Sequence, residues 1–256
     1  MTIREKLKRI PLLKMSVFLW RSLSNRHGFT EKFLLLIRFF REYRTYTKML
    51  RNTNFKLSLT DIYPQLLDNT ATTMIDPVYF FQDAWCAKKI FSNKPKSHVD
   101  VASKADMVGI ISQFTPTTMV DIRPIGLQLS GLSFIKGSIL DMPFPDNTIE
   151  SLSSICVIEH IGLGRYGDPL DPFGSEKAAT ELSRVLAADG SLYVSVPVDA
   201  ENKVYFNAHR AFTRDYFISL FPELSLVEET YIYGKELFDS YDSKKGFGTG
   251  LFYFRK

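Results

Sequence analysis

The sequence predicts an α/β fold, a three-layer sandwich in which helices cover both faces of a mostly parallel sheet. From Ser97 onward, short β-rich runs alternate with amphipathic runs, which is the pattern of such a fold. One run, Ser153–Ile158, reads as a central strand that is buried on both faces. Before residue 92 the apolar residues follow helical spacing without strong strand signals, which predicts a helical N-terminal region.

The individual elements follow from these patterns. Strands are expected over residues 97–103, 117–123, 132–139, 149–158, 191–198, 225–234 and 250–256. Helices are expected over residues 77–91, 105–114, 175–190 and 213–221. Ser175 and Thr213 are candidate N-caps, and Gly190 is expected to end its helix. We therefore predict a helical cap or appendage over residues 1–92 and an α/β domain over residues 93–256.

The charge of the chain is unevenly distributed. Residues 1–51 contain thirteen Lys and Arg against three acidic residues, whereas the remainder contains nineteen basic and twenty-five acidic residues. The apolar run Phe33–Phe40 is interrupted by Arg38 and is far shorter than the roughly 20 apolar residues that span a bilayer. Lys14 breaks the apolar start of the chain, which argues against a signal peptide. With two cysteines in apolar surroundings, the sequence predicts reduced thiols and a cytoplasmic protein.

The basic N-terminal segment allows three interpretations. The favoured one is a helical cap that packs on the sheet and leaves its charges in water. The second is an amphipathic helix that makes peripheral contact with the anionic inner surface of a membrane. The third, nucleic-acid binding, has no recognition motif to support it, so no nucleic-acid partner is expected. The oligomeric state is not predicted.

Two acidic residues lie in the first two expected strands. Asp100 is in the first strand and Asp121 ends the second, 21 residues later. An acid near this spacing in a nucleotide-binding unit accepts hydrogen bonds from ribose hydroxyls. The alternative is a strand-end Asp that caps a neighbouring turn.

Polar residues also follow the fourth and fifth expected strands, where a ligand of an open α/β sheet binds. The candidates are His160, Arg165, Tyr166 and Asp168 after the fourth strand, and His209 and Arg210 after the fifth. Histidine can take a proton near neutral pH, and arginine can hold an anionic group through paired hydrogen bonds. The alternatives are that His160 only orders its loop and that the arginines pair with Asp168 or Asp171. Four scattered histidines predict no metal site.

Longer motifs add a family resemblance. The stretch KGSILDMPFPDNTIESLSSICVIEHIG resembles the middle of class I S-adenosylmethionine-dependent methyltransferases, and RVLAADGSLYVSVP is similar to the helix and strand that follow there. The resemblance covers residues 97 to about 200 well and the remainder loosely. More narrowly, EHIGLGRYGDPLDP and FNAHRAF resemble an uncharacterised branch of methyltransferase-like proteins, known mainly as a domain of unknown function. The resemblance implies a Rossmann-like class I fold with S-adenosylmethionine as cofactor.

The resemblance also implies roles for single residues. It places Asp100, Ala102, Ser103, Asp121, Ser138 and Ile139 at the cofactor. Within this fold, the chemistry of the side chains assigns His160, His209 and Asp168 to catalysis and Arg165, Tyr166 and Arg210 to the acceptor, whereas in the family the Glu-His pair often only orders the loop. Two motifs depart from the family. The first loop has Ala102, Ser103 and Lys104 where glycines are usual, so a positive φ there would be costly, and Ser138 stands where an Asp is usual.

Two hypotheses about function follow. The first is an O-methyltransferase acting on a small polar or anionic acceptor, such as a sugar or a glycan precursor in polysaccharide modification. The second is a degenerate methyltransferase fold that serves as a non-catalytic binding or scaffold protein. The glycine-poor first loop favours the second hypothesis, whereas Asp121 and the polar loop from His160 to Asp171 favour the first.

Overall fold

The computed structural model describes residues 29–50, 54–59 and 62–256. The chain divides into two compact units, Met1–Met74 and Ile75–Lys256. The first unit contains α3 (Phe29–Met49), a helix that includes the apolar run Phe33–Phe40. Residues 1–28, which include Lys14 and the whole first half of the basic segment, lie outside the described residues. Within the described ranges, no helix is both long enough and apolar enough to cross a bilayer.

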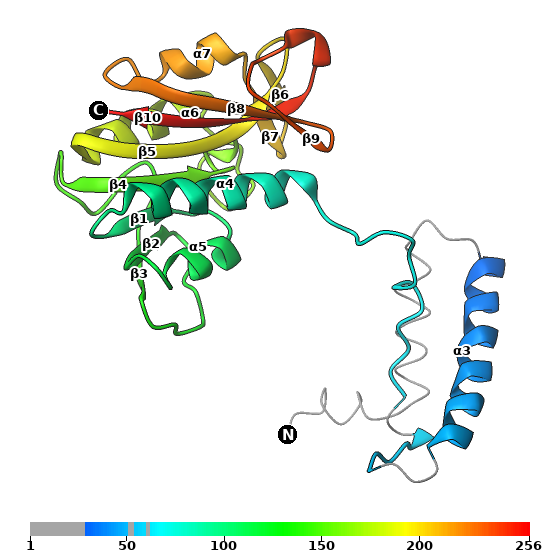
Figure 1. The fold of residues 1–256 in the computed structure, drawn as a ribbon. Helices are drawn as coiled ribbons and strands as arrows, with labels where there is room; N and C mark the ends of the chain where they lie inside the picture. The colour runs from blue at the N-terminus through cyan, green and yellow to red at the C-terminus, as the bar shows by residue number, and fades with distance from the viewer. Residues whose placement is uncertain (1–28, 51–53, 60–61) are drawn as a thin grey trace. The chain divides into compact units, whose positions relative to one another are not determined.

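The second unit is built on an eight-stranded sheet with the order β3-β2-β1-β4-β5-β10-β8-β9 (Figure 1). The strands are β1 His98–Val101, β2 Thr117–Asp121, β3 Leu132–Lys136, β4 Ile149–Ile155, β5 Leu186–Val198, β8 Ser225–Tyr233, β9 Glu236–Phe238 and β10 Gly248–Arg255. Strands β1 to β5 pair in parallel, and β10 pairs antiparallel with both β5 and β8. The carboxyl ends of the five parallel strands therefore share one edge of the sheet.

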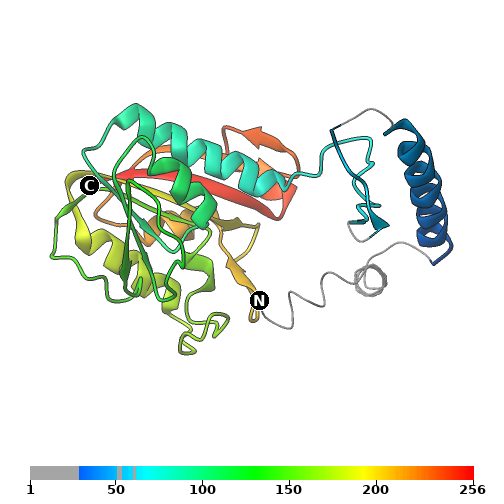
Figure 2. The same ribbon diagram turned by 90° about the horizontal axis from the view of Figure 1, so that it is seen from below.

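Helices cover both faces of this sheet, as the sequence predicts (Figures 1 and 2). Helices α4 (Pro77–Asn93) and α5 (Ala105–Ile111) pack on one face, where Ile90, Val108 and Tyr193 belong to one buried cluster. Helices α6 (Gly174–Val185) and α7 (Arg214–Ser219) pack on the other face, around Phe217 and Phe252. Full burial of each such side chain stabilises the fold by about 1.5–3 kcal/mol. The prediction of a three-layer sandwich is confirmed.

Helix α4 belongs to the α/β unit, which moves the domain boundary from residue 93 to residue 75. Asp76 caps the helix, because its Oδ1 accepts hydrogen bonds from the backbone N–H groups of Val78 at 2.9 Å and Tyr79 at 3.4 Å. Cys86 and Ile90 are fully buried on the sheet side. Helical spacing alone does not show which neighbour a helix packs against, so the sequence assigned this helix to the N-terminal part.

Several element ends differ from the expected ones. Helix α6 ends at Val185, and β5 already begins at Leu186 because Leu186 pairs with Ile149. Gly190 therefore lies inside a strand, where its carbonyl accepts a hydrogen bond from the backbone N–H of Lys256 at 3.1 Å. Ser175 lies within α6 rather than at its cap. Thr213 occupies the N-cap position of α7 as expected, but without a side-chain cap bond.

A short hairpin after β5 is absent from the sequence prediction. It consists of β6 (Lys203–Tyr205) and β7 (His209–Ala211), which pair antiparallel. Its residues alternate too briefly to give a strand signal, since each strand has only three residues. The hairpin matters because it carries His209 and Arg210 toward the loop that follows β4.

Candidate functional site

A pocket lies at the carboxyl ends of β1, β2 and β4. Seven of the residues that the sequence assigns to a site line it, namely Ala102, Asp121, Ser138, Ile139, His160, Tyr166 and Asp168. Its other walls are mostly apolar and include Val101, Val120, Ile122, Leu140 and Val157. The strand-end position predicted for the site and its largely apolar walls are typical of a ligand pocket.

The loop after β1 enters the pocket through Ala102. This residue has φ +56°, in the left-handed region, although it is not a glycine. Its backbone N–H donates to the Val120 carbonyl at 2.8 Å. The next residue, Ser103, donates its N–H to Asp100 Oδ1 at 3.1 Å, and its Oγ accepts from the Ile155 N–H at 2.9 Å. Ala102 thus adopts a positive φ although it is not a glycine, and this conformation carries the backbone strain that the sequence predicts.

Asp100 and Ser103 support this loop from behind. Asp100 is fully buried and Ser103 is nearly so, and neither lines the pocket. Burial raises the pKa of Asp100 to about 6. The polar atoms of both residues shape the loop, so this geometry does not favour their predicted contact with a cofactor.

Asp121 faces the pocket from the end of β2. Its Oδ1 accepts a hydrogen bond from the Arg123 N–H at 2.8 Å, and the Arg123 guanidinium lies 3.4 Å from each carboxylate oxygen. The same guanidinium lies 4.6 Å from the centre of the Tyr166 ring. Arg123 thus links the β2 end to the β4 loop, and sequence reasoning missed it. The available signal was a basic residue two positions after a strand-end acid.

Ser138 and Ile139 follow β3. The Ser138 Oγ accepts a hydrogen bond from the Leu140 N–H at 3.1 Å, so this hydroxyl also shapes a turn. Ile139 is buried and contributes an apolar wall. Both residues line the same pocket as Asp121.

His160 ends a short 3-10 helix, η2 (Ile158–His160), after β4. Its Nδ1 lies 2.6 Å from the Ala208 carbonyl oxygen. A carbonyl can only accept, so Nδ1 carries the hydrogen and Nε2 keeps the basic lone pair. Burial lowers the pKa of His160 to about 4, so the ring is neutral near pH 7.

Glu159 lies beside this histidine and was also missed by sequence reasoning as a site residue. Its Oε1 is 3.6 Å from His160 Nε2. Complete burial raises the pKa of Glu159 to about 8, so the carboxyl group carries a proton near pH 7. Glu159 and His160 are therefore both uncharged at neutral pH. The sequence motif alone does not show these protonation states, because they depend on burial.

The loop after β4 and the β6–β7 hairpin meet at Ala208. The Arg165 Nη1 donates to the Ala208 carbonyl at 2.9 Å, although the two residues are 43 positions apart. His160 binds the same carbonyl, and the Tyr166 ring packs edge-on against His160 at 5.6 Å. His160, Arg165 and Tyr166 thus form one cluster beside the hairpin, as the strand topology predicts.

A model of a family described as "Caenorhabditis protein of unknown function, DUF268" matches residues 144–236. A search of curated protein sequences finds no match. The N-methyltransferase NodS from Bradyrhizobium japonicum is similar in structure. The TM-score is 0.53 for its complex with S-adenosylhomocysteine, at 14% identity over 71% of this chain and 88% of NodS. It is 0.52 for NodS alone, at 16% identity over 74% of this chain and 99% of NodS.

This chain has the class I methyltransferase fold. The resemblance inferred from its motifs and the fold class are both confirmed. The same fold supports other chemistry, since the [4+2]-cyclase SpnF is also similar, with a TM-score of 0.50 and 10% identity over 68% of this chain and 81% of SpnF. Function therefore has to be argued from the site.

Within this methyltransferase fold, Arg210 is a structural residue. Its guanidinium is buried and donates to the carbonyl oxygens of Ile161, Asp171 and Pro172 at 2.5, 3.0 and 3.4 Å. It also donates to Ser175 Oγ at 3.2 Å. Its hydrogen bonds hold the β4 loop against α6, and this geometry does not favour the predicted contact of Arg210 with the acceptor.

Asp168 also organises the β4 loop. Its carboxylate accepts hydrogen bonds from the backbone N–H groups of Gly162 at 2.6 Å, Tyr166 at 3.2 Å and Gly164 at 3.4 Å. Desolvation alone would raise the pKa of Asp168, but these backbone donors outweigh it and lower the pKa below its usual value. Because these hydrogen bonds tie the carboxylate to the backbone of its own loop, we assign Asp168 to ordering the loop rather than to catalysis.

His209 lies next to the cluster but not in the pocket lining. Its ring packs against Tyr205 at 5.0 Å and Phe247 at 5.6 Å. Burial, with a smaller effect of Arg165, lowers the pKa of His209. Of the two histidines proposed as bases, only His160 reaches the pocket.

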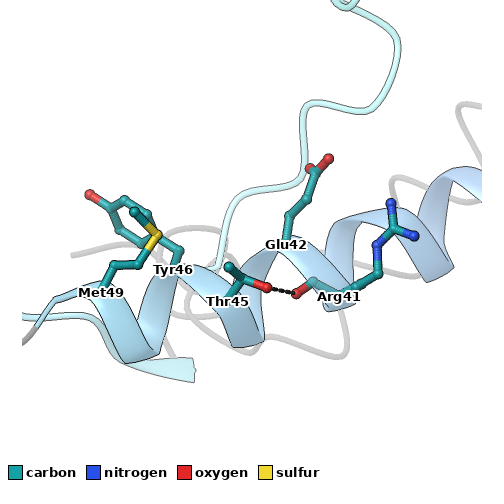
Figure 3. Close-up of a pocket in the computed structure, with 5 residues that line it drawn as sticks. All are labelled: Arg41, Glu42, Thr45, Tyr46 and Met49. Atoms are coloured by element: carbon teal, nitrogen blue, oxygen red, sulfur yellow. Dashed lines mark hydrogen bonds between the residues drawn. The ribbon is translucent and has the colours of Figure 1, made fainter.

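A second hollow lies on the N-terminal helix α3 (Figure 3). It is lined by Arg41, Glu42, Thr45, Tyr46 and Met49. All five side chains come from one helix, and the Thr45 hydroxyl donates to the Arg41 carbonyl at 3.1 Å. Among the described residues that line it, no group of side chains is arranged for chemistry.

Proposed function

We propose that this chain is an S-adenosylmethionine-dependent methyltransferase that transfers a methyl group to an oxygen of a small polar or anionic acceptor, such as a sugar or glycan precursor. One observation carries the proposal. In a methyltransferase fold, a mostly apolar pocket at the carboxyl ends of β1, β2 and β4 presents the Asp121 carboxylate beside the Ala102 loop.

The residues present fit this cofactor. Asp121 can accept hydrogen bonds from ribose hydroxyls, because the Arg123 guanidinium bonds that compete for it are long. Val101, Ile122 and Leu140 offer apolar surface for an adenine ring and a thioether chain. Ala102 leaves room for close approach of a ligand to the loop backbone. When bound, the cofactor supplies a methyl group on a sulfonium that is open to direct attack.

The residues around the pocket have separate roles in the proposed reaction. His160 is neutral, and its basic Nε2 takes the proton of the acceptor hydroxyl. Arg165, fixed by the Ala208 carbonyl, orients an anionic or polar acceptor. Tyr166 forms the outer wall and limits the access of water. Alignment by these groups supplies most of the expected rate enhancement, since methyl transfer is an in-line displacement.

The alternative is a non-catalytic binding or scaffold protein that retains the fold. It is favoured by the strained Ala102 and by Ser138 in place of an acid. Calorimetry with S-adenosylmethionine and S-adenosylhomocysteine separates the two proposals. Saturable one-to-one binding of both supports the enzyme, and no heat of binding at millimolar ligand supports the alternative. Release of S-adenosylhomocysteine in the presence of neutral sugars, sugar phosphates and sugar acids then tests the acceptor class.

For the cellular context, we propose a cytoplasmic protein whose basic N-terminal segment contacts anionic lipid. Helix α3 supports this, because Phe33, Leu34 and Ile37 are more than half exposed. Such a helix, with basic residues beside apolar ones, can lie at a membrane surface. Co-sedimentation of the full chain with anionic vesicles but not with neutral ones, weakened by salt, would support the proposal. Equal recovery with both would contradict it.

A further inference from the structure

A line of buried polar side chains runs through the sheet below the Ala102 loop. His98 on β1 lies between two serines of β4, with its Nδ1 2.9 Å from Ser151 Oγ and its Nε2 2.9 Å from Ser153 Oγ. The Ser153 Oγ in turn lies 2.5 Å from Asp100 Oδ2. All four side chains are at most 1% exposed. So many polar groups at the centre of an apolar sheet are costly unless every one is hydrogen-bonded.

The chemistry of the four groups fixes the direction of each hydrogen bond. An ionised Asp100 can only accept, so the Ser153 hydroxyl donates to it. Ser153 Oγ therefore accepts from His98 Nε2–H, and His98 Nδ1 accepts from the Ser151 hydroxyl. Burial lowers the pKa of His98 to about 3, so the ring stays neutral and keeps this tautomer. The three bonds point toward Asp100 and polarise one another.

The line ends at the loop that faces the pocket. Asp100 Oδ1 accepts the Ser103 N–H at 3.1 Å, directly after Ala102 with its φ of +56°. Ser103 Oγ then accepts the N–H of Ile155, at the end of β4. Both the backbone and the side chain of Ser103 are therefore tied to buried groups. A residue without glycine's freedom is held in a left-handed conformation by these bonds.

We propose that His98 and Ser153 are positioning residues for the cofactor, acting through Asp100 to hold the Ala102 loop in its binding conformation. In this chain the buried hydrogen bonds hold the loop in a positive-φ conformation that glycine would adopt without strain. The inference rests on the proposed function in one respect only, the identity of the ligand. The geometry of the loop can be measured without it.

The surroundings of Asp100 make this role dependent on pH. Asp121 on β2 and the Cys86 thiol on α4 face it, and Ser153 faces it from β4. With burial raising the pKa of Asp100 to about 6, the carboxylate that holds Ser103 is ionised above that pH and protonated below it. The Ser153 hydroxyl favours the ionised form, so its removal raises the pKa further.

The main experiment is calorimetric titration of S-adenosylhomocysteine into the full chain between pH 5 and 8. For the wild type, affinity should fall as pH drops through about 6. For Ser153→Ala, affinity at pH 7.5 should be about three- to ten-fold weaker and the pH midpoint should move upward. Ser154→Ala is the matched control, because this serine is equally buried on the same strand but its hydroxyl points to the Val101 carbonyl at 3.3 Å. It should retain both affinity and midpoint.

A rescue separates positioning from general loss of stability. Ala102→Gly removes the strain of the positive φ, so the loop should need less support. In Ser153→Ala, adding Ala102→Gly should therefore restore most of the lost affinity, so that the Ser153→Ala substitution weakens binding less in an Ala102→Gly background than in the wild-type background. Equal affinity and midpoint for wild type, Ser153→Ala and Ser154→Ala would overturn the proposal.

A second measurement tests the proposal even if the wild type binds no S-adenosylhomocysteine, a result that would refute the proposed function alone. Amide hydrogen exchange at Ser103 should be about ten-fold faster in Ser153→Ala than in the wild type or Ser154→Ala, because the acceptor of that N–H is less firmly held. Unchanged exchange at Ser103 would overturn the positioning role independently of any ligand.

Discussion

The loop after β1 and the loop after β4 both border the pocket, but they are built by different means. The first is short and has no glycine, and buried side chains hold its backbone through Asp100 and Ser103. The second is long and contains three glycines with positive φ, Gly162, Gly164 and Gly167. Its backbone is held by the Asp168 carboxylate and the Arg210 guanidinium.

The difference shows two ways of fixing an unusual backbone. In the β1 loop the strained conformation is imposed on Ala102 by hydrogen bonds inside the sheet. In the β4 loop, Cys156 directly after the strand also has a positive φ, of +52°. At the three later positions glycine removes the strain, and charged side chains then select one of many accessible conformations. The first loop should therefore be sensitive to changes in the core, and the second to changes within the loop itself.

The largest effect is expected from the histidine at the start of the β4 loop. His160→Ala should lower the turnover number by about 10²–10⁴-fold with little change in cofactor affinity, because it removes the proposed base. His209→Ala is the matched control, since His209 packs on aromatic rings outside the pocket lining, and it should cost less than about ten-fold. Steady-state kinetics on both variants decide between the histidines. A greater loss in His209→Ala would assign the base to the hairpin instead.

The Arg210 side chain tests how the β4 loop is held. Arg210→Met should lower the free energy of unfolding by about 3 kcal/mol, because several buried oxygens lose their donors. Arg255→Met serves as the control, because the Arg255 side chain is exposed and its guanidinium donates to the Asp189 carbonyl at 3.3 Å. It should cost less than about 0.5 kcal/mol. Urea unfolding measures both, and similar losses would contradict the structural role of Arg210.

Substitution of Asp121 tests its proposed hydrogen bonds to the ribose of the cofactor. Asp121→Ala should weaken S-adenosylhomocysteine binding by about ten-fold or more, because hydrogen bonds to a charged group contribute about 1.5–3 kcal/mol. Asp106→Ala removes an exposed carboxylate that pairs with Lys104 at 3.4 Å, and it should leave binding unchanged. If both variants bind like the wild type, the ribose assignment of Asp121 is wrong.

The smallest effect isolates glycine's conformational freedom. Gly167 has φ +86° and no atom within 4 Å of an added Cβ, so Gly167→Ala should cost about 1 kcal/mol of unfolding free energy from backbone strain alone. Gly126 has equally open surroundings without a positive φ, and Gly126→Ala should be neutral or slightly stabilising. Thermal unfolding of the pair would refute the strain argument if both variants were equally stable.

The fold was largely predictable, because strand burial and helix periodicity leave a local pattern in the sequence. The run before Ile158 reads as a buried central strand, and β4 is buried from Ser151 to Ile155. The strand end, the motif and the topology together indicated that His160 and Tyr166 lie at the carboxyl ends of the strands, where the pocket is found. Interactions between distant residues leave no such pattern. The Arg123–Tyr166 contact and the buried His98–Ser153 pair depend on register between strands, which spacing along the chain does not encode.

The same limit explains why two predicted roles are not favoured by the structure. Arg210 and Asp168 look like ligand-binding groups in a polar loop, since their residue types suit an anion and a proton. In the structure their partners are backbone groups of the loop itself. A loop with several turns has many unpaired N–H and C=O groups, and nearby charged side chains satisfy them before any ligand does.

The position of β10 has a consequence for the order in which the protein folds. This strand lies between β5 and β8 and follows both in the sequence. During synthesis the ribosome therefore produces the two flanking strands before the one that joins them. Until residues 248–255 emerge, β5 and β8 each present an open edge that can pair with another chain. Pairing of β10 with both strands then closes the two edges in one step.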